Sequence, residues 1–529
     1  MPRIELPDPF NVATWFVDRN LEEGRGERVA IECGSERVTY RQVFENVNRV
    51  ANVLRRALHV RREERVALLL LDTPEFAYSF FGAIRMGAVA VPLNTLLKPR
   101  DYEYLLNDCR ARVAMVSEAL LPQLDAIPRD RLRYLEHVVV VGPARGDRPS
   151  LSALMSSHSS ESAPAPTSKD EPAFWLYSSG STGPPKGCVH LHHDMVVCAE
   201  LYARQILNLV AEDRCFSVAK LFFAYGLGNA LYFPFAVGAT SILWPGPPTA
   251  ANVYEVVERH RPTLFFSVPT NYAILLAHRR EDRDFDLSSV RCAVSAGEGL
   301  PAALYHRFRE RFGVEILDAI GSTEALHMFI ANRPGATRPG SSGQVIPGYE
   351  ARIVDDEGRD LPDGEVGHLL IRGDSTCAFY WNQHEKTKAT IQGDWLRTGD
   401  KYRRDAQGYF WHAGRSDDML KVGGIWVSPV EIESTLLEHP AVLEAAVVGR
   451  EDRDRLVKPA AYVALRPGFA AGEVLAAEIR EWVASRIAEY KRPRWVEFLP
   501  ELPKTATGKI QRFKLRKMAA GDESQARRD

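Results

Sequence analysis

Short apolar runs that alternate with helical patterns are the feature that most constrains the fold of this chain. Val66–Leu71 is continuous and apolar, which is typical of a strand buried on both faces. A helical stretch follows it, and further strand-like runs come at Ala88–Leu93, Val113–Ser117 and Val138–Val141. Strands that alternate with helices predict an α/β region with a largely parallel sheet.

A hairpin and a helix are predicted at the N-terminal end. Arg28–Cys33 and Arg37–Tyr40 flank a Gly-Ser turn, a pattern typical of a β-hairpin. Thr39 and Gln42 have the spacing of a capping box, in which each side chain bonds the other residue's backbone N–H. Apolar residues then follow at helical spacing, so we expect a helix to begin directly after the hairpin.

The chain changes character near residue 415. Its 529 residues are enough for several domains. Ala378–Phe410 is rich in aromatic and turn residues, and the chain beyond it reads as a short α+β unit with an amphipathic helix at Glu473–Ala488. We therefore predict one large region at 1–416, made of two or three subdomains, and a small α+β domain at 417–529.

Charge and cysteine content exclude several functional classes. The formal net charge of −2 gives no reason to expect nucleic acid or an acidic membrane as the main partner. The 7 cysteines are scattered without CxxC spacing, which argues for a reducing compartment and against a disulfide framework or a zinc site. The N-terminal segment lacks the pattern of a signal peptide, so we predict a cytoplasmic protein.

Leu221–Tyr254 contains no charged residue, a property that it shares with membrane-spanning segments. A membrane-spanning helix needs about 20 predominantly apolar residues, whereas glycines and prolines interrupt this stretch repeatedly. We expect buried strands and loops here, and no membrane contact.

The segment YSSGSTGPPKGCVH, from Tyr177 to His190, follows a strand-like run and has the composition of an anion-binding loop. Its hydroxyls and backbone N–H groups can surround a phosphate, its glycines allow close approach, and Lys186 adds positive charge. It is not a Walker A loop, which needs Gly-Lys followed directly by Ser or Thr. Taken alone, the segment fits a phosphate loop and a flexible connector equally well.

Five motifs, in order, resemble those of the adenylate-forming superfamily, which includes acyl-CoA synthetases, luciferases and the adenylation domains of peptide synthetases. They are YSSGSTGPPKG, Gly321–Glu324, Trp395–Asp400, Gly414–Asp418 and Pro503–Lys509. They are similar to that superfamily's phosphate loop, acidic core, ribose motif, hinge and C-terminal catalytic-lysine motif. The segments FWLYSSGSTG, KLFFAYGLGN, IGSTEALHMF and DDMLKVGGIWVSPVEIE further resemble the benzoate-CoA ligase group.

The resemblance implies both a fold and a reaction. The fold would be a large N-terminal domain of αβ-sandwich subdomains plus a distorted β-barrel, with a small mobile α+β C-terminal domain. The reaction would use ATP, Mg²⁺ and coenzyme A, with benzoate or a hydroxy- or aminobenzoate as the acid. The carboxylate attacks the α-phosphate of ATP and gives an aryl-adenylate and pyrophosphate. A thiol then attacks the adenylate and gives a thioester and AMP.

Carried onto this sequence, the resemblance implies a nucleotide site. Lys186 and the loop hydroxyls would hold the β- and γ-phosphates, and Thr323 would contact the α-phosphate. Glu324 would hold Mg²⁺, a hard cation that prefers oxygen ligands. Asp400 would accept the ribose hydroxyls, with Arg415 as a further donor. The implied ATP and AMP contacts are Ser178, Ser179, Gly180, Ser181, Thr182, Gly183, Lys186, Ile320, Gly321, Ser322, Thr323, Glu324, Asp400, Arg415 and Lys509.

Three implied roles belong to the C-terminal part. Lys509 would be the catalytic cation that offsets the repulsion between the carboxylate and the α-phosphate, together with Lys186 and Glu324 in the catalytic set. Asp417 would be the hinge about which the small domain turns between the two half-reactions. Gly423 and Gly424 would line the CoA tunnel, where glycine lets pantetheine pass close to backbone.

The acid pocket implied by the resemblance consists of Ala224, Tyr225, Gly321, His327 and Met328. Amino-acid-activating relatives have an aspartate near the first of these positions, so its absence argues against an amino-acid substrate. A flat tyrosine wall and two small residues suit a planar ring. His327 could bond a ring substituent or support the wall, and both interpretations remain open.

Other interpretations compete with these. Ile320 stands where the superfamily usually has an aromatic residue against adenine, so aliphatic packing is expected. His190, His192 and His193 match no common zinc site, which favours structural roles. Glu324 could be a helix-start carboxylate and Asp400 a turn residue. The enzyme could also load a carrier protein's pantetheine in trans, act as a luciferase-like monooxygenase, or bind nucleotide without catalysis. We expect a monomer or homodimer.

Overall fold

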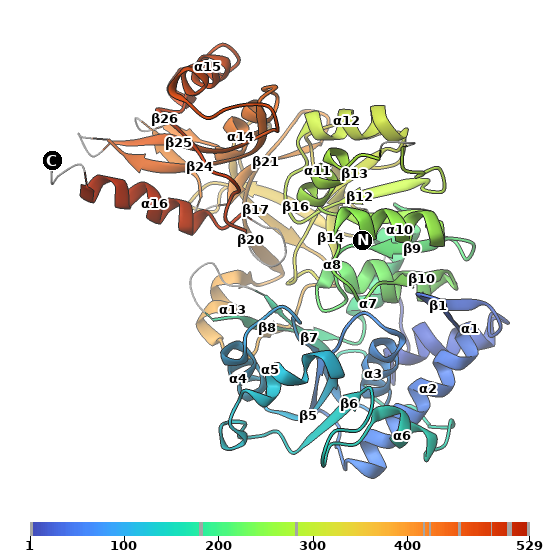
Figure 1. The fold of residues 1–529 in the computed structure, drawn as a ribbon. Coiled ribbons are helices and arrows are strands. Elements are labelled where there is room, and N and C mark those ends of the chain that lie inside the picture. The colour runs from blue at the N-terminus through green and yellow to red at the C-terminus, as the bar shows by residue number, and fades with distance from the viewer. Residues whose placement is uncertain are drawn as a thin grey trace.

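A computed structural model describes residues 4–178, 184–280, 284–415, 418–422, 425–452, 456–487, 489–504 and 510–525. Two large mixed sheets, a smaller antiparallel sheet and a separate C-terminal unit make up the described chain, as Figure 1 shows. The N-terminal half of the sequence alternates between the two large sheets, so residues far apart in sequence meet at their edges.

The first large sheet has seven strands in the order β18-β8-β7-β4-β3-β5-β6, in which β18 is Phe379–Tyr380, β8 is Lys186–Leu191 and β7 is Pro172–Ser178. The other four strands are parallel: β3 (Arg65–Leu69), β4 (Val89–Pro92), β5 (Ala111–Ser117) and β6 (His137–Val141), which forms the far edge. The four predicted apolar runs therefore each form a strand. Every residue of β4 is buried, as expected for a strand covered on both faces.

The second large sheet has nine strands in the order β15-β14-β13-β12-β11-β9-β10-β1-β2, in which β15 is Gln344–Val345 and β14 is Met328–Ala331. Five parallel strands form its centre: β9 (Arg214–Ser217), β10 (Thr240–Leu243), β11 (Leu264–Ser267), β12 (Cys292–Ser295) and β13 (Ile316–Gly321). The predicted hairpin is its edge, with β1 (Val29–Cys33) antiparallel to β2 (Glu36–Thr39). The predicted capping box begins α2 (Tyr40–Asn52), since Thr39 and Gln42 bond each other's backbone N–H.

The uncharged stretch at 221–254 is buried, but it is more helical than predicted. Short helices α8 (Ala224–Leu227) and α9 (Phe233–Val237) flank a π-helical turn, and strand β10 and the start of α10 (Ala250–His260) follow. Pro234 lies in the first turn of α9 and Gly238 ends it with φ +79°, so the residues that break a long helix instead delimit a short one. None of the described helices is long and apolar enough to cross a membrane.

A third sheet follows where the resemblance implies a distorted β-barrel. It consists of antiparallel strands β16 (Glu350–Val354), β17 (Gly367–Arg372), β19 (Ile391–Gln392), β20 (Trp395–Arg404) and β21 (Phe410–Arg415). The long strand β20 pairs with three neighbours, and its far end brings the candidate ribose motif opposite β21.

The C-terminal unit is an α+β structure with its own apolar core, built around β24 (Val442–Glu451) and β25 (Val457–Leu465). The remaining elements are β22 (Leu420–Val422), β23 (Ile425–Val427), β26 (Trp495–Phe498), α14 (Pro429–Leu437), α15 (Glu473–Ala484) and α16 (Arg512–Gln525). α15 confirms the predicted helix, which ends a few residues earlier than expected.

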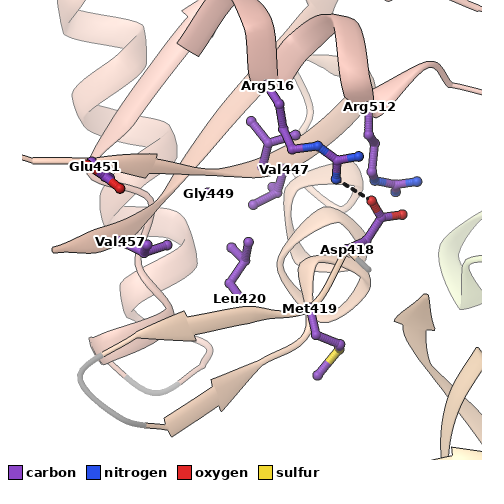
Figure 2. Close-up of a pocket in the computed structure, with 10 residues that line it drawn as sticks. Asp418, Met419, Leu420, Val447, Gly449, Glu451, Val457, Arg512 and Arg516 are labelled. Atoms are coloured by element: carbon purple, nitrogen blue, oxygen red, sulfur yellow. Dashed lines mark hydrogen bonds and ion pairs between the residues drawn. The ribbon is translucent and has the colours of Figure 1, made fainter. Parts of the chain in front are cut away.

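The C-terminal unit contacts the rest of the chain through α14, which lies against β21 and α12 (Ala302–Phe312). Within the unit, α16 crosses the end of β24 and leaves a pocket of about 250 Å³ (Figure 2). The predicted boundary between residues 416 and 417 stays a prediction, because both residues lie outside the described part.

A buried carboxyl in β13 yields a test of this packing. Asp318 is 3% exposed, and burial raises the pKa of its carboxyl well above 3.8. Above about pH 4 the unfolded chain loses this proton while the folded chain keeps it, so stability falls as pH rises towards the folded pKa. The neutral Asp318→Asn variant should lack this loss, at up to about 1.4 kcal/mol per pH unit.

Denaturant unfolding of both proteins from about pH 4 to about pH 7 measures the effect. The variant's stability relative to the parent should increase with pH, whereas the exposed Asp147→Asn control should give a smaller slope. A stability difference that does not change with pH would contradict the buried, protonated carboxyl.

Candidate active site

The predicted phosphate loop connects two paired strands at one edge of the seven-stranded sheet. β7 (Pro172–Ser178) and β8 (Lys186–Leu191) are antiparallel, and Ser178 pairs with Lys186 at the end of the hairpin next to the connecting segment. The Lys186 ammonium lies 4.4 Å from the ring centre of Tyr380, within the range of a cation–π contact. The hairpin therefore holds the residues on either side of the phosphate-loop segment opposite each other.

Glu324 receives two hydroxyl donors from that same sheet. The hydroxyl of Tyr380 donates to Glu324 Oε1 at 2.7 Å, and that of Ser178 donates to the same oxygen at 3.3 Å. The backbone N–H of Cys377 donates to the Glu324 carbonyl at 2.7 Å. Burial, and then the Glu324 carboxylate, raise the pKa of Tyr380, so its hydroxyl stays protonated as a donor. The sequence analysis missed Tyr380.

This half-buried carboxylate fits a Mg²⁺ site completed by a nucleotide. Mg²⁺ in nucleotide enzymes is typically held by one or two carboxylates together with substrate phosphates and water. Both hydroxyl donors bond Glu324 Oε1, and the ammonium of Lys186, the candidate phosphate-binding lysine, lies over the ring of Tyr380. The described residues contain no cluster of three or more His, Cys, Asp or Glu that would hold a metal without a substrate.

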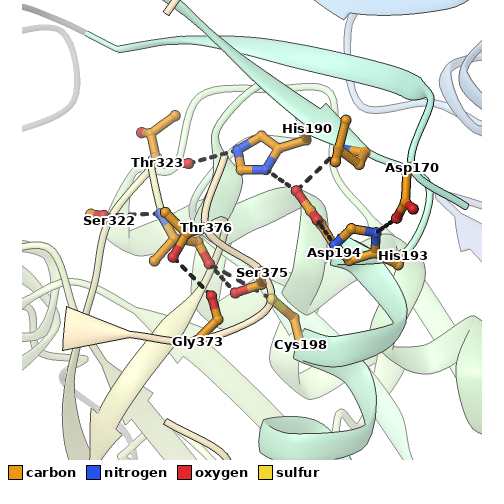
Figure 3. Close-up of polar contacts among 12 residues, drawn as sticks. Asp170, His190, His193, Asp194, Cys198, Ser322, Thr323, Gly373, Ser375 and Thr376 are labelled. Atoms are coloured by element: carbon orange, nitrogen blue, oxygen red, sulfur yellow. Dashed lines mark hydrogen bonds and ion pairs between the residues drawn. The ribbon is translucent and has the colours of Figure 1, made fainter. Parts of the chain in front are cut away.

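His190 on β8 bonds the backbone of the acidic turn, as Figure 3 shows. Its Nε2 lies 2.8 Å from the carbonyl oxygen of Thr323, and its Nδ1 lies 2.7 Å from the carboxylate of Asp194. Both side chains are fully buried. His192 accepts a hydrogen bond from the backbone N–H of Val12 at 3.1 Å. These contacts are structural, as the sequence analysis favoured over metal binding.

The turn is held by one bond within it and by one bond from Ser375, 50 positions further along the chain. The Ser322 hydroxyl accepts from the N–H of Ala325 at 3.2 Å, and the Ser375 hydroxyl donates to the Ala325 carbonyl at 2.7 Å (Figure 3). Ile320 and Gly321 end β13, where they pair with β14 (Met328–Ala331). The acidic motif is therefore a tight hairpin turn, not the start of a long helix.

Asp400 and Arg415 meet across the third sheet. The two residues are paired on β20 and β21, and Arg415 Nη1 lies 3.4 Å from Asp400 Oδ1. His412 Nε2 lies 3.9 Å from the same oxygen, and burial lowers the pKa of His412 to about 4, which leaves the ring neutral. A carboxylate acceptor beside a guanidinium suits a vicinal diol, the function that the resemblance assigns to this pair.

The five predicted pocket residues come from helix α8 and the β13–β14 hairpin, which meet at the contact between the rings of Tyr225 and His327. Gly321 pairs with Met328, and a Cβ on Gly321 would lie 2.4 Å from the carbonyl oxygen of His327, so only glycine fits there. The Tyr225 hydroxyl donates towards the carbonyls that end β11 and β12, at 3.2 Å each. Ala224 precedes it at the first turn of α8 and is 8% exposed.

His327 is packed as part of the pocket wall. Its ring centre lies 4.4 Å from that of Phe233 and 5.8 Å from that of Tyr225. Its Nε2 lies 3.2 Å from Asn229 Oδ1, and burial lowers the pKa of His327 to about 3, so the neutral ring donates there. These contacts support the wall interpretation, while a bond to a ring substituent stays a prediction. The sequence analysis missed Asn229.

Several predicted residues lie outside the described part of the chain, and their roles stay predictions. They are Ser179, Gly180, Ser181, Thr182 and Gly183 in the phosphate loop, Asp417 at the hinge, Gly423 and Gly424 in the CoA tunnel, and the catalytic Lys509.

Comparison with known families decides what this arrangement is. The family model described as "AMP-binding enzyme" matches residues 17–381, and the model "AMP-binding enzyme C-terminal domain" matches residues 431–509. The chain belongs to the AMP-binding enzyme family. The resemblance drawn from the five motifs is thereby confirmed.

Individual family members match along nearly the whole chain. A benzoate–CoA ligase from Thauera aromatica is 50% identical, with 97% of each chain covered. A 4-hydroxybenzoate–CoA/benzoate–CoA ligase from Rhodopseudomonas palustris is 46% identical, with 97% of this chain and 95% of that one covered. The crystal structure of an anthranilate CoA ligase in complex with anthranoyl-AMP superposes with a TM-score of 0.94 at 47% identity, covering 98% and 99% of the two chains.

Gly228, in this family member, offers a test of the pocket wall. A Cβ there would lie 2.5 Å from His327 Cδ2, and the surrounding rings leave the imidazole no room to move. We expect Gly228→Ala to destabilise the protein by about 1–3 kcal/mol, as overpacked cores do. Thermal unfolding measures this, with Gly472→Ala as the control, since no atom lies near that Cβ position. Equal melting temperatures for the two variants would contradict the close contact.

Proposed function

We propose that this protein is an ATP-dependent aryl-acid–CoA ligase that acts on benzoate or a hydroxy- or aminobenzoate. It forms an aryl-adenylate and pyrophosphate, then an aryl-CoA thioester and AMP. The observation that carries the proposal is full-length similarity to aryl-acid CoA ligases. The ring contacts among Tyr225, Phe233 and His327, where the resemblance implies the acid pocket, support it.

The first half-reaction brings together two anions, and the site must offset their repulsion. Lys186 and the loop hydroxyls hold the outer phosphates. Glu324 would hold Mg²⁺, which would supply positive charge at the phosphate oxygens when bound. Asp400 and Arg415 fix the ribose, and Ile320 packs against adenine. Lys509 places its ammonium between the aryl carboxylate and the α-phosphate.

The second half-reaction needs the thiol to reach the same carbonyl carbon. Rotation about Asp417 withdraws Lys509 and brings Gly423 and Gly424 towards the tunnel through which pantetheine enters. The C-terminal unit is a separate α+β structure with its own core, which supports movement as a body. CoA is favoured over a carrier protein as the acceptor, because the similar proteins are CoA ligases.

The acid is a small planar one. The pocket wall has rings at Tyr225, Phe233 and His327, and its glycines at 228 and 321 leave no space for a Cβ. None of these three rings carries a carboxylate that could pair with an α-ammonium group. These features support benzoates over amino acids.

A panel of acids tests the proposed function. We expect release of AMP with ATP, Mg²⁺, CoA and benzoate, with kcat/KM for benzoates at least about 100-fold above that for amino acids or long-chain fatty acids. Coupled AMP detection gives the rates, and mass spectrometry identifies the aryl-CoA. Transfer to a holo-carrier protein in preference to CoA would favour the alternative acceptor, and no AMP release with any ring acid would refute the proposal.

Lys509→Ala tests whether Lys509 acts in only the first of the two half-reactions. We expect benzoate-dependent ATP–pyrophosphate exchange to fall about 10²–10³-fold, as when an oxyanion donor is lost, while thioester formation from preformed benzoyl-adenylate is largely kept. The exposed Lys514→Ala in α16 is the matched control for loss of a nearby lysine. Equal loss of both half-reactions would contradict the assigned role.

A further inference from the structure

The residues on either side of the Lys509 segment are bonded to each other. Lys504 and Ile510 pair as an antiparallel bridge, and the N–H of Gln511 donates to the carbonyl of Pro503 at 2.8 Å. The Lys504 ammonium also bonds the Glu444 carboxylate on β24. Both ends of the segment are therefore attached at one place, and helix α16 begins directly after it.

Glu433 on α14 anchors the first residue of that helix. Arg512 Nη2 lies 2.8 Å and 2.7 Å from the two oxygens of Glu433, whose side chain is only 10% exposed. Glu433 Oε1 also accepts the N–H of Val447 on β24 at 2.7 Å. One carboxylate thus joins α14, β24 and the start of α16. The pKa of Arg512 is raised chiefly by Glu433, which favours the charged pair.

A second arginine of α16, one helical turn later, also pairs with a carboxylate. Arg516 donates to Asp418 at 2.6 Å, and Asp418 immediately follows the predicted hinge position. Figure 2 shows Arg512 and Arg516 extending from the same face of α16 beside the C-terminal pocket. The helix is therefore held at two points on the side that faces the hinge.

Arg512 also lies close to the large N-terminal region. After burial, its charge is the next largest influence that lowers the pKa of His412, and the Glu298 carboxylate acts on Arg512 in turn. His412 is the residue whose Nε2 lies 3.9 Å from Asp400 in the candidate ribose site. Helix α14, which carries Glu433, packs against β21, the strand that carries His412 and Arg415, so the Glu433–Arg512 pair lies at the contact between the C-terminal unit and the strand of the candidate ribose site.

We propose that Glu433, acting through Arg512, is a positioning residue that aims the Lys509 segment at the nucleotide site during adenylation. This inference rests on the proposed function. One guanidinium nitrogen of Arg512 lies within hydrogen-bond distance of both oxygens of a largely buried carboxylate, and this charge-assisted pair holds the start of α16 against α14. Removing the charge of Glu433 loosens that attachment without removing Lys509 itself.

Glu433→Gln removes one interaction of the carboxylate and keeps another. The ion pair with Arg512 is lost, whereas the amide oxygen can still accept a hydrogen bond from the N–H of Val447. We expect aryl-acid-dependent ATP–pyrophosphate exchange to fall about 10- to 100-fold, the scale of a small misplacement of a catalytic group. Thioester formation from preformed aryl-adenylate should stay within about twofold, because it does not use Lys509. Arg512→Lys, which keeps the charge but replaces the planar guanidinium with an ammonium on a different stem, should give a smaller loss of the same kind.

Glu497→Gln is the matched control. It breaks the 2.7 Å ion pair with Arg450 on another face of the same unit and should leave both half-reactions unchanged. Both half-reactions are measured on one preparation, so their ratio does not depend on the folded fraction. Parallel loss of both in Glu433→Gln and Arg512→Lys, or the same selective loss in Glu497→Gln, would overturn the inference and leave the function intact. Failure of the unmodified protein to form any aryl-adenylate would overturn both.

Discussion

The carboxylate of Glu324 joins the two large sheets, and the geometry of the nucleotide site depends on that junction. Glu324 belongs to the turn after β13, in the nine-stranded sheet, while its two hydroxyl donors come from the seven-stranded sheet. His190 crosses the same boundary to the Thr323 carbonyl. A half-buried carboxylate is stable only with donors directed at it, so these bonds also fix the distance between the phosphate loop and the acidic turn.

The features that the sequence predicted well are those that short-range physics determines. The apolar run Val66–Leu71 became β3 because a strand covered on both faces needs no polar alternation. The Thr39–Gln42 spacing produced a capping box because both bonds lie within one helical turn. The five motifs worked for another reason: they identify a family, and Gly321 shows the geometry behind one of them, since a Cβ there meets backbone.

The features that the sequence missed are pairs of residues that are distant in the chain. Tyr380 bonds Glu324 across 56 positions, and Asn229 bonds His327 across 98, so no local spacing could predict either. The stretch at 221–254 was expected to form strands and loops, whereas its first part is helical. A helix that is apolar on every side shows no periodicity, and the glycines and prolines that suggested loops are in fact its limits.

Burial leaves three histidines at or near this site without charge. It lowers the pKa of His327 to about 3 and those of His192 and His412 to about 4. Near neutral pH these three rings therefore contribute no positive charge to the site. They cannot supply charge in one half-reaction and withdraw it in the other, whereas a lysine carried by the C-terminal unit can. The Glu433–Arg512 pair matters for this reason. A cation on a long side chain helps only when the backbone from which the side chain extends is held in place.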